Sequence, residues 1–163
     1  MATPFDISVK TFKRHQIKRN PVSIFANNAG LFLLLSLWFY TVVAKFADLK
    51  LFENQMQQMP FNDLVKLMIT YTVPALEIIT ILLLILGKRF PGLILSLLLL
   101  LSFTIYITLV LSHFFPKTPC SCGGLISTMS WKMHFWFNLM FIVINVYCLI
   151  YIKRKGGSQA GRK

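Results

Sequence analysis

Two cysteines one residue apart, Cys120 and Cys122, are the most chemically specific feature of the sequence. Pro119 precedes them and two glycines follow them, so the backbone around the sulfurs can take unusual angles. A disulfide between residues so close in sequence closes a small, strained ring, and strained, exposed disulfides exchange more readily than structural ones. The motif therefore predicts a thiol–disulfide exchange centre. A structural or unreactive pair of cysteines at the tip of a loop is the alternative.

The same region offers ligands for a soft metal ion. His113 and His134 lie on either side of the two cysteines along the chain, with Met129 and Met133 nearby. Thiolate, imidazole and thioether groups together would suit copper(I) or zinc. The spacing matches no zinc motif, so metal handling remains an alternative and no residue is assigned as a metal ligand.

Polar side chains recur along one face of each of the last two apolar segments. One set consists of His134, Asn138, Asn145 and Cys148, and the other of Ser102, Tyr106 and His113. The spacings of three, four and seven positions place the members of each set on one side of a helix. Such a stripe in lipid faces the interior of a bundle, where it either bonds to neighbouring helices or, at His134, assists proton transfer at the cysteines.

One acidic residue, Glu77, stands in the middle of an apolar segment, just after Pro74. An ionised carboxylate at that depth in a membrane costs at least about 2.5 kcal/mol, so the side chain must face inward and be protonated or paired. Lys45, at the outer end of the first apolar segment, is the expected partner because its aliphatic stem can extend along apolar surface. The pair is either a structural ion pair or part of a proton-handling site.

Composition places these residues in an integral membrane protein. Of the 163 residues, 56% are hydrophobic and 13% are charged, against roughly a quarter charged in soluble domains. Four apolar segments have the length of about 20 residues that a membrane-spanning helix needs. We expect an all-α, four-helix membrane bundle whose spans cover approximately residues 23–45, 65–87, 90–114 and 131–152. Asn62, Pro91 and Ser130 are suited to the beginnings of the second, third and fourth helices.

The basic residues predict the orientation of the bundle. Most of the seventeen Lys and Arg residues lie in an N-terminal arm (1–20), in the turn at Lys88 and Arg89, and in a C-terminal tail (153–163). Basic segments stay on the cytoplasmic side, so we expect both termini inside and residues 46–66 and 114–131 outside. This distribution explains the net charge of +12 without nucleic-acid binding. The tail is expected to be flexible.

The first outer loop is expected to contain a short amphipathic helix. Leu49, Phe52, Met56 and Met59 recur at spacings of three and four, and Pro60 ends the pattern. Such a helix lies on the membrane surface, or the same residues form an ordered loop that covers the bundle.

Together these features resemble the MauE/DoxX group of small redox-associated membrane proteins. The resemblance is carried by the segment from Tyr40 to Phe52, the Pro74-Ala-Leu-Glu77 element and the Cys-Ser-Cys-Gly-Gly loop, followed by Trp131, His134 and Asn138. The loop is similar to the MauE-type branch, and the resemblance covers about residues 25–150. It implies a multi-pass protein of the bacterial cytoplasmic (inner) membrane with the cysteine loop facing the periplasm.

The resemblance also implies that Cys120 and Cys122 exchange electrons with a thioredoxin-like partner, and that Lys45 and Glu77 are the family's buried charged pair. Cys122, nearer the start of the last helix, is expected to be the more reactive thiol. A quinone among the spans is a possible cofactor, although aromatic residues are common in membrane helices. A non-enzymatic subunit or assembly factor of a larger membrane complex is the main alternative function.

Overall fold

The computed structural model describes residues 21–57, 59, 61–114 and 130–160, and within them the chain forms five helices. The helices are α1 (Pro21–Ala47), α2 (Leu49–Gln57), α3 (Asp63–Ile85), α4 (Arg89–Leu111) and α5 (Trp131–Ala160). In this described part of the chain, all except α2 are long and apolar enough to cross a membrane. Large apolar side chains, such as Phe25 and Trp136, cover the outer surface of the bundle. The expected all-helical fold with four spanning helices is confirmed.

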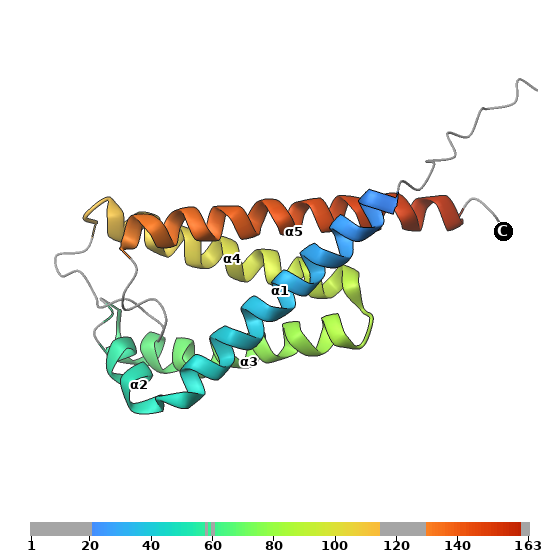
Figure 1. The fold of residues 1–163 in the computed structure, drawn as a ribbon. Coiled ribbons are helices and arrows are strands. Elements are labelled where there is room, and N and C mark those ends of the chain that lie inside the picture. Colours follow the sequence, from blue (N-terminus) through green and yellow to red (C-terminus); the bar gives the residue numbers. More distant parts are fainter. Residues whose placement is uncertain (1–20, 58, 60, 115–129, 161–163) are drawn as a thin grey trace, which may run out of the picture.

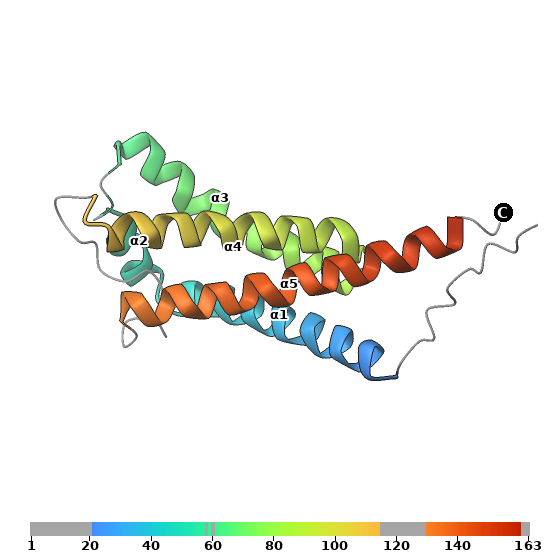
Figure 2. The same cartoon turned by 90° about the horizontal axis from the view of Figure 1, so that it is seen from above.

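The four long helices form a closed ring in which α1 packs against α3 and α5, and α4 packs against the same two helices. Figure 1 shows α2 at one end of the bundle, beside the end of α1 and the beginning of α3. The turn between α3 and α4 lies at the opposite end, where α1 begins and α5 projects beyond the other helices. Seen from above, α3 changes direction along its length, as expected for a helix that contains Pro74 (Figure 2).

The helix ends follow the local signals in the sequence. The Asn62 side chain accepts a hydrogen bond from the Leu64 amide (3.3 Å), and the Ser130 hydroxyl accepts one from the Met133 amide (3.3 Å). Pro91 occupies the first turn of α4, so all three expected helix starts are confirmed. Gly87, with φ 76°, follows the last turn of α3 in the left-handed conformation that favours glycine.

All four spanning helices differ from the predicted ranges: α1 and α3 by two residues at each end, and α4 and α5 mainly at their C-terminal ends. α4 ends at Leu111 rather than near residue 114, because the chain leaves the helix there and His113 takes a positive φ of 54°. α5 continues to Ala160, into the segment expected to be a flexible tail. Helix propagation adds one backbone hydrogen bond for each residue fixed, so an established helix extends readily through Lys and Arg residues.

The short helix α2 covers one end of the bundle with its apolar face. Phe52, Met56 and Met59 are buried and pack with Phe61 and Ile69. Leu49, expected on the same face, is half exposed. The regularly spaced apolar residues of this segment therefore contact the other helices. An ordered segment that covers the bundle would make such contacts.

Polar contacts join the helices in the middle of the bundle. The Ser96 hydroxyl oxygen accepts hydrogen bonds from the Trp38 indole N–H (2.8 Å) and from the Asn145 amide (2.7 Å), and all three side chains are buried. These bonds link α1, α4 and α5. Nearby, a Cβ added to Gly30 would lie 2.8 Å from the Cys148 sulfur, so only glycine lets α1 approach α5 this closely.

We expect Ser96→Ala to destabilise the bundle by about 1–3 kcal/mol, because it leaves two buried donors without their acceptor. Thermal unfolding of the purified protein in detergent measures the change. Ser102→Ala is the matched control, since the Ser102 side chain is exposed and its hydroxyl bonds to the Leu98 carbonyl of its own helix. Equal melting temperatures for the two variants would contradict the assigned role of Ser96.

Candidate functional site

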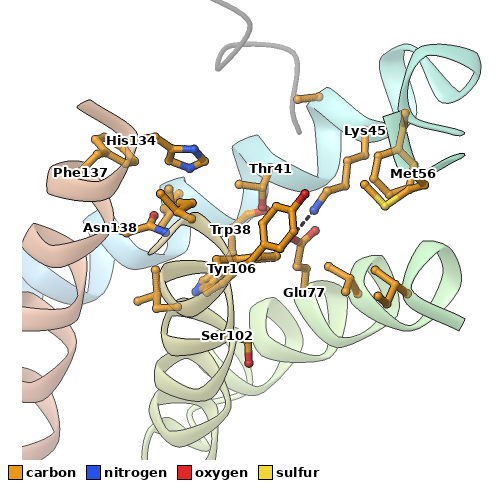
Figure 3. A pocket seen from close by; sticks show the side chains of 18 of the residues that line it. Trp38, Thr41, Lys45, Met56, Glu77, Ser102, Tyr106, His134, Phe137 and Asn138 are labelled. Carbon is orange, nitrogen blue, oxygen red and sulfur yellow. Dashed lines mark hydrogen bonds and ion pairs between the residues drawn. The ribbon is translucent and has the colours of Figure 1, made fainter. Parts of the chain in front are cut away.

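The site is centred on an ion pair between the Lys45 ammonium group and the Glu77 carboxylate Oε1, drawn as a dashed line in Figure 3. Lys45 lies near the end of α1, and Glu77 lies in α3 one turn after Pro74. The Glu77 side chain has no exposed surface, and that of Lys45 is 11% exposed. The predicted partners are therefore together, with the Glu77 side chain fully buried and that of Lys45 mostly buried.

Two aromatic rings also contact the ammonium group. Lys45 Nζ lies 5.8 Å from the centroid of the Phe52 ring and 5.7 Å from that of Phe103. Both distances are within the range of cation–π attraction, which strengthens where water is excluded. Through these contacts and Glu77, the ammonium group of α1 is bound to side chains of α2, α3 and α4.

A cavity of about 310 Å³ opens beside the ion pair. Its walls are mostly apolar and come from all five helices, with Trp38, Met56, Phe103 and Phe137 among them. The polar side chains that line it are Tyr40, Thr41, Lys45, Glu77, Ser102, Tyr106, His134 and Asn138. A mostly apolar cavity with a few convergent polar groups has the general character of a small-molecule binding site.

The polar stripe on α5 contributes two of these side chains. His134 and Asn138, one helical turn apart, face the cavity from the side opposite Lys45 and Glu77 (Figure 3). Within the described residues, no hydrogen-bond partner is present for His134 Nδ1, Asn138 Nδ2 or Glu77 Oε2. Buried polar atoms usually have a partner, so these three atoms mark the polar part of the cavity.

The structure brings together six of the polar residues selected from the sequence: Lys45, Glu77, Ser102, Tyr106, His134 and Asn138. Asn145 is buried two turns farther along α5, where it bonds to Ser96 and does not line the cavity. His113 was expected on the interior face with Tyr106, and this expectation is wrong. His113 lies beyond the end of α4 and is exposed, so the helical spacing does not extend to it.

The predicted exchange pair, Cys120 and Cys122, lies outside the described residues. In the sequence this pair stands between Phe114, the last described residue after α4, and Ser130, the residue immediately before α5. Among the residues that the structure describes, no group of three His, Cys, Asp or Glu side chains could hold a metal ion.

Sequence reasoning missed the aromatic residues that surround the charges, above all Phe103 and Trp38. Each lies in an apolar helix with many similar residues, and the sequence holds fifteen Phe. Phe52 was selected for the apolar spacing of its helix, but nothing in that spacing indicated contact with an ammonium group. The contact of the two Phe rings with Lys45 becomes visible only when the packing of α1, α2 and α4 is known.

The fold and the site define the class of this protein. It is a four-helix membrane bundle with a buried ion pair beside a cavity that polar side chains line in part. Comparison with family models identifies its family: the model described as "Methylamine utilisation protein MauE" matches residues 22–151, which include all four spanning segments. The chain belongs to the MauE family. Comparisons with curated proteins and with solved structures give no match.

A double-mutant cycle with Glu77→Gln and Lys45→Met tests the ion pair. Each single change leaves one buried group without its partner, so we expect a loss of about 3–5 kcal/mol in the free energy of unfolding. The double variant should lose clearly less than the sum, because the two groups interact directly. Unfolding in detergent micelles measures all four proteins.

Asp63 and Lys66 provide the control cycle. They form an i,i+3 pair at 3.1 Å in α3, but the Asp63 side chain is 91% exposed. Water screens such a pair, so Asp63→Asn and Lys66→Met should be nearly additive. Additive losses at Lys45 and Glu77 as well would show that the buried pair is not an energetic unit.

Proposed function

We propose that this protein is a membrane thiol–disulfide exchanger that transfers electron pairs between Cys120/Cys122 and a periplasmic thioredoxin-like protein. The observation that carries the proposal is the position of the cavity. Its lining residues Trp131 and His134 belong to the first turns of α5, directly after the segment that contains the two cysteines. The described residues on either side of that segment, at the end of α4 and the beginning of α5, thus lie at the same end of the bundle as the buried acid–base groups.

The charge distribution supports a periplasmic position for this end. Lys88 and Arg89 lie at the turn between α3 and α4, and Lys153 and Arg154 lie near the projecting end of α5 (Figure 1). Both groups are therefore at the end away from α2. The positive-inside rule assigns that end to the cytoplasm and the cavity end to the periplasm. The periplasm is an oxidising compartment in which exchangeable disulfides persist.

The proposed reaction is exchange through a mixed disulfide. A thiolate of the pair attacks one sulfur of the partner's disulfide, and the partner's other sulfur leaves as a thiolate that takes up a proton. The second cysteine then attacks the mixed disulfide, which leaves Cys120 and Cys122 oxidised and the partner reduced. Two electrons and two protons pass to the partner, and the reverse sequence reduces the pair.

The cavity groups would assist this exchange by handling protons. Only the thiolate is nucleophilic, so a base that accepts the thiol proton accelerates the first step. His134 is the proposed base, because the unpartnered Nδ1 of its ring can accept a proton. The family is described by its part in methylamine utilisation. We therefore propose that the protein whose disulfides are exchanged belongs to that process.

The redox titration of Cys120 and Cys122 is the test. We expect a reversible disulfide with a midpoint potential between roughly −120 and −270 mV, the range of thiol oxidoreductases. Thiol alkylation followed by mass spectrometry in defined glutathione buffers measures it. A membrane-impermeant alkylating reagent, added to oriented spheroplasts, should modify the reduced pair from the periplasmic side.

The single variant Cys120→Ser should accumulate a mixed disulfide with the partner, because Cys122 then lacks its resolving thiol. Cys148→Ser is the matched control, since Cys148 is fully buried between α1 and α5 and should leave the titration unchanged. A pair that stays reduced in every buffer, or a disulfide that resists reduction, would rule out exchange.

A further inference from the structure

The cavity beside the ion pair has the properties of a ligand-binding site within the membrane. Thiol–disulfide exchange alone does not require such a site. Its volume of about 310 Å³ is near the lower limit for small-molecule sites and suits a single ring with short substituents. Trp38, Phe103 and Phe137 provide flat apolar walls. The four long helices around it are apolar enough to span a membrane, so an apolar ligand is the kind of molecule available to this cavity.

Three polar atoms at this cavity point to a ligand that forms hydrogen bonds. Glu77 Oε2, His134 Nδ1 and Asn138 Nδ2 have no partner in the part of the chain that the structure describes. Glu77 has no exposed surface, and Asn138 is only 5% exposed, so bulk water does not satisfy them. A hydrocarbon chain in the cavity would leave all three atoms without a hydrogen bond.

The charges restrict the ligand to a neutral molecule. Lys45 and Glu77 neutralise each other, so the cavity presents no net charge to a ligand. A charged ligand would be attracted by one member of the pair and repelled by the other, so its own charge would remain uncompensated. Neither charged ligand would find the counter-ion that a low-dielectric site requires.

The remaining groups suit a molecule that can both accept and donate hydrogen bonds. The Asn138 amide donates, Glu77 Oε2 accepts, and His134 Nδ1 does either according to its tautomer. The carbonyl oxygens of a quinone accept hydrogen bonds, and the hydroxyl groups of a quinol donate them. We propose that this cavity binds the ring of a membrane quinone between Glu77 on one side and His134 and Asn138 on the other.

This proposal deepens the proposed function by naming the chemical class of the electron acceptor, and it rests on that function only for the redox step. In that step the thiols of Cys120 and Cys122 form a disulfide and release two electrons and two protons. The quinone takes up both electrons and both protons and becomes a quinol. Binding itself requires no cysteine.

Quenching of tryptophan fluorescence by decylubiquinone in phosphatidylcholine nanodiscs tests the binding. Trp38 and Trp131 line the cavity and report on its contents, whereas Trp136 is 69% exposed and is removed by Trp136→Phe. We expect saturable quenching in this background. Decylbenzene, which has the ring and tail but no carbonyl oxygens, should not compete at equal concentration.

Two variants and a matched control identify the site. Ala44 lines the cavity, so Ala44→Leu should abolish saturable quenching by filling it. Ala75 lies exposed on α3 outside the cavity, and Ala75→Leu should leave the isotherm unchanged. Asn138→Leu removes the amide donor and should weaken binding at least tenfold. Asn138→Leu also removes a buried polar group that has no hydrogen-bond partner, so the variant protein should keep its fold. Circular dichroism would verify this.

Quenching that increases linearly and equally in all these proteins would overturn the proposal. So would equal competition by decylbenzene together with an unchanged isotherm for Asn138→Leu, since that result identifies an apolar lipid pocket. The Cys120→Ser/Cys122→Ser variant separates the two proposals. It should bind decylubiquinone normally, so a failure of thiol exchange leaves the binding result intact, and a failure of binding leaves the cysteine titration intact.

Discussion

The burial of one ammonium group and one carboxylate in apolar surroundings is the constraint on which the rest of this structure depends. Removing either charge from water is unfavourable by several kcal/mol, and only their close pairing offsets the loss. Lys45 on α1 and Glu77 on α3 pair directly, while Phe52 of α2 and Phe103 of α4 lie against the ammonium group. Four helices must therefore keep their relative positions for the charges to remain stable. The contacts that form the site are therefore also contacts that hold the helices together at this end of the bundle.

This constraint divides the bundle into two parts with different packing. Toward the end where α1 begins, small residues and neutral hydrogen bonds hold the helices close, as at Gly30 against Cys148 and at Ser96. Around the ion pair, aromatic side chains and residues of α2 surround a cavity of about 310 Å³. A close-packed core specifies a rigid support, and the open part can accept a ligand without disturbing it. For this reason the packing at the end of the bundle that contains the site differs from the packing at the opposite end.

Much of this arrangement could be predicted from the sequence because lipid leaves few alternatives. Long apolar segments without charges specify spanning helices, and a single acidic residue such as Glu77 must find a partner inside the bundle. Helix spacing placed His134 and Asn138 on the inner face of α5, where they lie. The same reasoning failed for His113, because periodicity holds only while the helix continues, and α4 ends at Leu111. The aromatic contacts of Lys45 could not be predicted, since they depend on how three helices meet.

The ion pair also has two chemically unequal members. The Lys45 ammonium group has three neighbours that attract it, the Glu77 carboxylate and two aromatic rings. Glu77 has one ionic partner at Oε1, and its Oε2 faces no hydrogen-bond donor among the described residues. If the proposed quinone site exchanges protons with Glu77, Oε2 is the oxygen that would take up the proton, since Lys45 contacts Oε1. In the proposed quinone site, this asymmetry favours Lys45 as the fixed charge and Glu77 as the group that exchanges a proton with the quinone.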